Sequence, residues 1–227
     1  QIAEVQGATI NAECAVIYDG ESRWALNATC GFEGFPGQNK DKDMPLVHYG
    51  SLWACNVSVA VIEQLSDFSP YRLIVVPSLY MLKSGVAKRL MEFVENGGIL
   101  VVSTMSAVVD ETNRVFLNGL PGDGLREFCG VWSEDVDSPA PGEQKVHLTK
   151  FTINGENLFP VIGRAEIIHA EDAEVLATYE LDFYEKQPAI TRKKVGKGLV
   201  YYIAADLGPE FLTEFYLVLF YMFYMFP

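Results

Sequence analysis

Four apolar runs in the first half of the chain are continuous and rich in Val and Ile. They cover residues 14–18, 57–62, 73–77 and 99–103. In a parallel sheet with helices on both faces, each strand is buried on both sides and therefore reads as an unbroken apolar run. The pattern predicts a largely parallel sheet built from these four strands.

The segment between the third and fourth runs predicts a helix. Its apolar residues fall at i, i+4, i+7 and i+8 on one helical face: Val86, Leu90, Phe93 and Val94. Ser84 is placed to cap the amino end of this helix, and two glycines at 97 and 98 are placed to end it. A strand, a helix and a second strand at this spacing form a right-handed crossover. The same reasoning predicts a helix over residues 45–55 and a short helix that runs through Phe128.

The second half of the chain has a different character. Residues 134–142 are acidic and Pro-rich, which predicts a loop. Strand-like segments follow at residues 145–153, 174–179, 189–194 and 199–204. The glycines at 196 and 198 predict a hairpin turn between the last two strands. We therefore expect one α/β domain with a β-rich second half.

The C-terminal end is almost wholly apolar. A helix is predicted from Pro209, and residues 215–227 carry no charge. This stretch is shorter than the ~20 residues needed to span a bilayer, and Glu214 precedes it. We expect residues 1–227 to form a single domain with its core at about 13–208. Residues 209–227 are then an apolar helix, or a truncated junction to further chain.

Composition and charge narrow the choice of partners. Hydrophobic residues make up 49% of the chain, which is enough for a substantial core. The formal net charge is −13, and no run of Lys and Arg interrupts the acidic character. Such a surface repels nucleic acids and anionic membranes. We therefore expect neither as a partner.

The cysteines favour a reducing compartment. Cys14, Cys30, Cys55 and Cys129 have no close metal-binding spacing, and four in a chain of 227 residues are too few for a disulfide scaffold. We expect free thiols in a cytoplasmic protein. No basic segment followed by an apolar run opens the sequence, so no signal peptide is expected, and a start at Gln1 suggests a piece excised from a longer chain.

Polar side chains follow three of the predicted strands. In an open α/β sheet, ligands gather at the carboxyl ends of the strands, which share one edge. The polar residues expected there are Asp19, Glu21, Ser22, Arg23, Ser78, Tyr80, Thr104, Ser106, Asp110 and Glu111. A small-ligand site at this edge is therefore geometrically feasible.

Known catalytic patterns are missing from the sequence. There is no G-x-S-x-G elbow, and the residues after the fourth run include no glycine that would allow such a bend. His48, His147 and His169 match no nucleophile-and-base spacing, and no metal-ligand cluster or nucleotide-binding loop is present. We therefore predict no catalytic residue, no metal site and no cofactor.

Trp24 and the arginines allow two interpretations. The Trp24 ring could be buried in the core, or it could anchor an interface, where Trp and Arg are enriched. Arg23, Arg114 and Arg126 stand near carboxylates in segments expected to be loops or helix ends. Arginine in such a place commonly pairs with a carboxylate across an interface.

Four blocks of the sequence resemble, in the same order, the middle domain of glycoside hydrolase family 42 β-galactosidases. The resemblance covers about residues 13–137 and 173–204, and departs from the family pattern at residues 32–43 and in the apolar tail. The blocks are AVIYDGESRWAL, YRLIVVPSLYML, FVENGGILVVSTMSAVVDETNRVFLNGLPGDGLREFCGV and AEVLATYELDFYEKQPAITRKKVGKGLVYYIA.

The resemblance implies a fold, an assembly role and a parent enzyme. The family's middle domain is a trimerisation domain with a flavodoxin-like, class I glutamine amidotransferase-like three-layer sandwich. In the family a (β/α)8 barrel precedes it, and two barrel glutamates hydrolyse terminal β-D-galactosides with retention. A barrel of that type takes roughly 250 residues, so this chain cannot contain it and no catalytic residue is carried over.

What the resemblance does transfer is a place at the subunit contacts of a homotrimer and at the rim of the sugar pocket. The loops implied to make these contacts are residues 19–24 and 108–114. The expected interface or pocket-rim residues are Asp19, Glu21, Ser22, Arg23, Trp24, Asp110, Glu111 and Arg114. The alternative is a free-standing amidotransferase-like domain that binds a small ligand or a carbohydrate at its strand ends.

Overall fold

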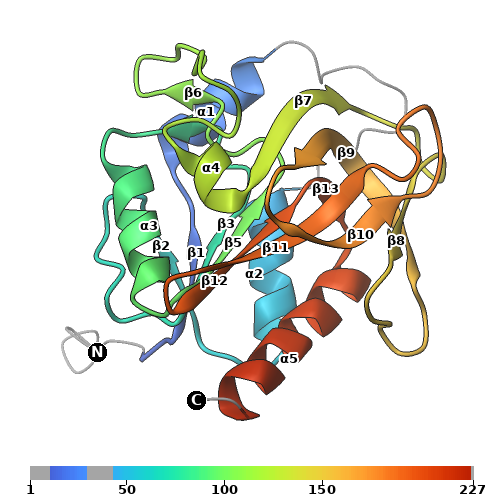
Figure 1. Cartoon of the computed structure of the whole chain (residues 1–227). Helices are drawn as coiled ribbons and strands as arrows, with labels where there is room; N and C mark the ends of the chain where they lie inside the picture. The colour runs from blue at the N-terminus through green and yellow to red at the C-terminus, as the bar shows by residue number, and fades with distance from the viewer. Residues whose placement is uncertain (1–10, 30–42, 226–227) are drawn as a thin grey trace, which may run out of the picture.

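A parallel sheet forms the centre of the chain, as the apolar runs predict. The computed structural model describes residues 11–29 and 43–225 (Figure 1). The departure from the family pattern at residues 32–43 therefore lies outside the described residues, except for its last position. The strands stand in the order β12, β5, β3, β1, β2, and every neighbouring pair among them is parallel. Their bounds are β1 Cys14–Ile17, β2 Val59–Ile62, β3 Leu73–Val76, β5 Ile99–Ser103 and β12 Gly198–Ile203.

An antiparallel extension continues this sheet on the β12 side, so the β-rich second half is confirmed. The hairpin turn at residues 196–197 joins β12 to its antiparallel neighbour β11. The order then runs β10, β8, β9, β13, with β7 also paired to β9. Their bounds are β7 Val131–Asp137, β8 Lys145–Leu148, β9 Leu158–Ala170, β10 Glu174–Tyr179, β11 Pro188–Val195 and β13 Ala205–Leu207.

Helices cover both faces of the parallel strands. Helices α2 (Met44–Ala54) and α5 (Pro209–Met225) lie on one face, and α3 (Val86–Glu95) and α4 (Leu125–Cys129) on the other (Figure 1). Because side chains alternate along a strand, Val75 faces the first pair of helices while Ile74 and Val76 face the second. The result is a three-layer α/β sandwich.

The α3 helix forms as predicted but is capped differently. Gly85, at φ +79°, is the N-cap residue, so the Ser84 cap was wrong. The Ser84 backbone N–H instead donates to the Glu111 carboxylate at 2.9 Å. At the other end Gly98 lies against the Phe93 ring. A Cβ at position 98 would stand 2.3 Å from an atom of that ring, so a residue larger than glycine would displace Phe93.

Two predictions for the second half need correction. Residues 134–137, expected in a loop, belong to β7, and β9 was not predicted although it is thirteen residues long. Pro160, Gly163 and Arg164 interrupt its apolar pattern. A Cβ at Gly163 would stand 2.7 Å from the Asp206 carboxylate, so β9 needs a strand-breaking residue where it meets β13.

The apolar C-terminal stretch is part of α5, which packs along the sheet rather than standing apart from it. The inner side of α5 buries Phe211, Phe215 and Leu219 in the same core cluster as α2. Among the described residues, no helix has both the length and the hydropathy required to cross a bilayer.

Candidate functional site

The segment after β1 is a helix, which corrects the expectation of a contact loop at residues 19–24. Helix α1 covers Gly20–Ala28, and Asp19 caps it by accepting a hydrogen bond from the Ser22 backbone N–H at 3.0 Å. The Ser22 hydroxyl accepts the Met81 N–H at 3.0 Å. Both Asp19 and Ser22 are buried, so they hold α1 in place from within.

A short two-stranded sheet joins the two segments that the sequence suggested as contact loops. Strand β4 (Met81–Leu82) pairs in parallel with β6 (Val109–Asp110). Next to β4, the Lys83 ammonium lies 3.0 Å from the Asp19 carboxylate and 2.7 Å from the Glu21 carboxylate. The second segment therefore also begins as a strand, and residues 81–84 tie α1 to it.

The charges around Lys83 support one another. The hydrogen bond to Glu21 and the proximity of Asp19 raise the pKa of Lys83 despite partial burial. Burial alone would raise the pKa of Asp19, but hydrogen bonds from Ser22, Gln64 and Lys83 lower it overall. Both groups are thus held in their charged forms at neutral pH.

The turn after β6 is built around the Asp110 carboxylate. One oxygen of this carboxylate accepts from the Thr112 N–H at 2.8 Å, the Thr112 hydroxyl at 2.6 Å and the Arg114 N–H at 3.1 Å. These hydrogen bonds lower the pKa of Asp110. The turn presents Arg114 and the next residues at a defined position, with Leu117 94% exposed.

Trp24 is 73% exposed, which excludes the interpretation of a buried core ring. On the same helix the Arg23 guanidinium pairs with Asp43 at 2.5 Å and lies over the Tyr18 ring at 5.9 Å. Helix α1 and strand β6 lie at the same end of the molecule (Figure 1). We call the half-buried Arg23 and the exposed residues at this end the carboxyl-edge surface. The exposed residues are Tyr18, Glu21, Trp24, Glu111, Arg114, Val115 and Leu117.

Val115 and Leu117 were missed by the sequence reasoning. Their sequence context does not mark them as exposed, because the same loop contains Phe116, which is packed. The Phe116 ring lies where a Cβ of Gly122 would stand. An exposed and a packed apolar residue alternate there, and the sequence does not distinguish them.

The interior of the carboxyl edge is filled by the chain itself. Ser78, Thr104 and Ser106 are buried. The Arg164 guanidinium, from β9, donates to the Ser78 hydroxyl at 2.9 Å and pairs with the Asp206 carboxylate at 2.8 Å. The space where a small ligand was considered is thus occupied by side chains of β9 and β13.

Glu166 lies deeper in the same edge and is fully buried. Its carboxylate accepts from the Tyr202 hydroxyl at 2.9 Å, and the Ser133 and Thr104 hydroxyls and the Met105 N–H lie near enough to favour its charged form. Burial raises the pKa of Glu166 in spite of these hydrogen bonds. Met105 stands at φ +62°, an uncommon backbone for a residue other than glycine, where β5 ends.

Each histidine lies beside a hydroxyl or a carboxylate of the chain, and the described cysteines are free thiols with raised pKa values. His48 bonds to the Tyr216 hydroxyl, His147 lies beside Glu180 and His169 beside Glu134, at 2.6, 3.2 and 2.6 Å. The described thiols, of Cys14, Cys55 and Cys129, are free, and burial raises their pKa values to about 12, 11 and 12. Within residues 11–29 and 43–225, no three His, Cys, Asp or Glu side chains are grouped to hold a metal ion.

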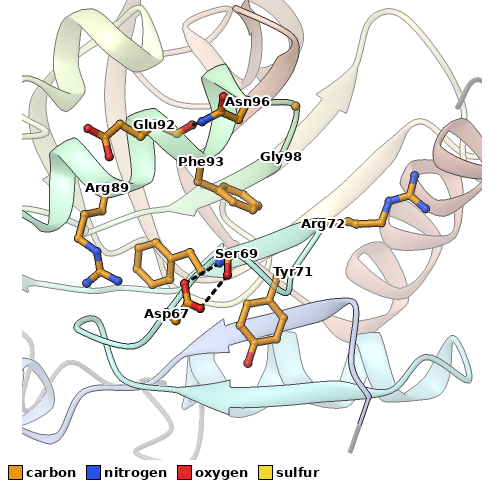
Figure 2. A pocket seen from close by; sticks show the side chains of 11 residues that line it. Asp67, Ser69, Tyr71, Arg72, Arg89, Glu92, Phe93, Asn96 and Gly98 are labelled. Carbon is orange, nitrogen blue, oxygen red and sulfur yellow. Dashed lines mark hydrogen bonds between the residues drawn. The ribbon is translucent and has the colours of Figure 1, made fainter.

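A hollow of about 500 Å³ lies at the opposite edge of the sheet, where β3 and β5 begin. Figure 2 shows Arg89 and Arg72 on its two sides, with the Phe93 and Tyr71 rings between them. Arg89 lies 4.6 Å over the Phe68 ring and donates to the Ser66 carbonyl. The hollow is thus separate from the residues that the sequence suggested.

Replacing Asp19 with Ala tests whether the α1 cap supports the carboxyl-edge surface. We expect a loss of about 1–2 kcal/mol in unfolding free energy, because the cap and the Lys83 ion pair are both removed. The folded-state pKa of Asp19 is lowered, so this contribution is present above its usual pKa of 3.8 and disappears as the pH falls below it.

The measurement is urea unfolding of both proteins between pH 7 and pH 2, which extends below the usual pKa of 3.8 and into the range of the lowered folded-state pKa. Asp19→Asn is the matched control, since Asn also caps helices but carries no charge. The variant and the parent should converge at acid pH. A loss in Asp19→Ala that is independent of pH would contradict the role assigned to the carboxylate.

Comparison with known proteins shows the family to which most of the chain belongs. Residues 12–220 match the family described as "Beta-galactosidase trimerisation domain" of glycoside hydrolase family 42. Among curated proteins, β-galactosidase BglY of Alicyclobacillus acidocaldarius is 40% identical over 222 residues, and β-galactosidase Pbg of Clostridium perfringens is 39% identical over 223. Each match covers 95% of this chain but 31% of the relative, so the chain spans about a third of their length.

Solved structures agree. The β-galactosidase of Bacillus circulans sp. alkalophilus superposes with a TM-score of 0.86 at 33% identity, covering 94% of this chain and 31% of that one. The cold-adapted β-galactosidase of Rahnella sp. R3 gives 0.86 at 35% identity, covering 97% and 32%. By sequence and by fold, the chain belongs to the trimerisation (middle) domain family of glycoside hydrolase family 42 β-galactosidases.

Proposed function

We propose that this chain is the assembly domain of a longer β-galactosidase polypeptide, in which residues 1–227 form one domain that supplies no catalytic group. Hydrolysis of terminal β-D-galactosides with retention then belongs to a barrel elsewhere in the polypeptide. The family match and the threefold greater length of the relatives support this proposal. The free thiols of the described cysteines are consistent with a cytoplasmic enzyme.

The homotrimer contact is proposed to lie on the carboxyl-edge surface. The carrying observation is Trp24, a large aromatic side chain held in the open on a helix that is capped and tied to β4 from within. Exposed Trp with Arg beside it and a charged rim is the composition of an interface core and its border. Rigid supports reduce the entropy lost on association.

The eight residues suggested by the sequence divide into two roles in this proposal. Glu21, Arg23, Trp24, Glu111 and Arg114 stand where a neighbouring subunit could touch them. Asp19, Ser22 and Asp110 act as positioning residues, since their oxygen atoms accept backbone hydrogen bonds that hold α1 against β4 and shape the turn after β6.

The proposal is tested by the mass of the full-length polypeptide, measured by light scattering over a dilution series. Trp24→Ala and Leu117→Ser are each expected to weaken the trimer about 30-fold or more, as an interface anchor worth about 2 kcal/mol would. Phe183→Ala, at an exposed aromatic residue on the β10–β11 connection, serves as the control. Dissociation curves that coincide for all four proteins would overturn this assignment of the contact.

A further inference from the structure

Helices α2 and α5 form one packed layer on their face of the sheet. The His48 ring nitrogen and the Tyr216 hydroxyl share a hydrogen bond at 2.6 Å, and the Cys55 thiol donates to the Thr213 carbonyl at 3.4 Å. Burial lowers the pKa of His48 to about 4, so this contact is between neutral groups near pH 7. The two helices therefore present one joint outer side.

That outer side is apolar except at the amino end of α5, which carries Glu210 and Glu214. On α2 the exposed positions are Leu46 at 64%, Trp53 at 68%, Gly50 and Ala54, all within one helical arc. The α2 helix has the sequence MPLVHYGSLWA, in which no residue is charged near pH 7, because its one His is buried and neutral. On α5 the exposed residues between Glu214 and Tyr221, where the described side chains end, are Leu217, Val218 and Tyr221; the exposed Glu210 and half-buried Glu214 lie on the same helical arc nearer the amino end.

Such a surface differs from the outer side of the other long described helix, α3. The chain carries 21% charged residues, and the solvent-facing side of α3 shows the ordinary pattern, with Lys88, Glu92 and Glu95 exposed. A helix whose outer side meets water normally bears charged residues there. Contiguous exposed apolar surface marks a place that another protein surface covers.

We infer that the outer side of α2 and α5, through Leu46, Trp53, Leu217, Val218 and Tyr221, is covered by another domain of the same polypeptide. This inference rests on the proposed function, which places the chain within a protein about three times its length. Where it meets α2, the covering surface must itself be apolar and uncharged, because α2 offers no ionic partner.

A second copy of the chain is the less suitable occupant. Contacts between subunits that fold separately keep a polar, charged rim, and the carboxyl-edge surface has one. Permanent contacts that never meet water resemble a domain core cut in half, and the α2–α5 side has that composition. Two copies would also bring together chains of net charge −13 without a charge pair at the contact.

The test is the rate at which a maleimide reagent labels Gly50→Cys, in a Cys30→Ser, Cys55→Ser background. Gly50 has nothing within 4 Å of where its Cβ would stand, so the new thiol fits without strain. Ala54→Cys is a second variant on the same side, and Lys88→Cys on α3 is the exposed control. Each is measured in this chain alone, in the full-length trimer and in full-length subunits dissociated by dilution or by Trp24→Ala.

In both full-length states the thiol at position 50 is expected to react at least about 10-fold more slowly than the thiol at position 88. In the chain alone the two should react at similar rates. Fast labelling of the intact trimer would overturn the inference. Protection that disappears when the subunits separate would overturn it in favour of a second copy. The mass of the full-length protein reports separately on the proposed trimer, so each idea can fail without the other.

Discussion

Glu166→Ala is expected to lower the unfolding free energy by about 3–5 kcal/mol, because the buried Tyr202 hydroxyl loses its acceptor, neighbouring polar groups lose a polar partner and a cavity remains. The Tyr202 hydroxyl donates to Glu166 at 2.9 Å, and the Ser133 and Thr104 hydroxyls and the Met105 N–H lie beside the same carboxylate. Chemical denaturation, followed by far-UV circular dichroism, measures the loss as a lower midpoint at an unchanged slope.

Glu166→Gln is the matched control and gives the loss a pH signature. Glutamine keeps one acceptor oxygen, so its loss should be smaller, about 1–2 kcal/mol at pH 7. Burial raises the folded-state pKa of Glu166 above 4.5, so the parent loses stability as the pH rises through that window, whereas Gln does not titrate. The loss in Glu166→Gln is therefore expected to shrink between pH 4.5 and pH 7. A loss that grows over this interval would contradict the raised pKa.

Asp206→Ala is expected to lower the unfolding free energy by about 3–5 kcal/mol, because it leaves the largely buried Arg164 guanidinium without its carboxylate partner. Asp206 accepts from the Arg164 side chain at 2.8 and 3.2 Å and from the Arg164 backbone N–H at 3.0 Å. Thermal and urea unfolding at pH 7 both report the change.

The control for Asp206 is the double variant Arg164→Met, Asp206→Leu. Removing both charges also removes the desolvation cost of the pair, so the double variant should recover most of what Asp206→Ala loses. If the double variant were as unstable as the single one, the damage would come from lost packing, and the ion pair would not be its cause.

The parallel core could be predicted because its signals are local. Each of the four apolar runs contains one of β1, β2, β3 and β5, since a strand covered on both faces needs unbroken apolar sequence. The α3 helix and the β11–β12 hairpin likewise follow from periodicity and from glycines. The family resemblance, confirmed by the match over residues 12–220, added the assembly role that no periodicity carries.

What the sequence could not predict depends on long-range partners. Strand β9 pairs with β7, β8 and β13, and its Gly163 and Arg164 make sense only beside Asp206. Helix α1 was overlooked because GESRWALNA has little apolar periodicity. Its support comes from the Asp19 cap and from Met81, which is 59 positions away from Ser22.

The candidate site shows the same division. The sequence located the right end of the sheet for Glu21, Arg23 and Trp24, because carboxyl ends of parallel strands share an edge. It could not separate the buried Asp19 and Ser22 from their exposed neighbours, since burial depends on where β4 lies. Leu117 escaped notice because apolar residues in loops are common and are usually buried.

The buried polar side chains of Arg164, Glu166 and Asp206 have an evolutionary consequence. Folds of this class bind ligands where these side chains now lie, so a pocket could reopen only if several of them changed together. A single substitution at one of these residues leaves a buried charge or hydrogen-bond donor without its partner. Such a change removes much of the few kcal/mol that keep a domain folded. Sequences on the way to an open pocket would therefore be unstable. New binding activity is expected to arise more readily on the outer loops of this domain than at its strand ends.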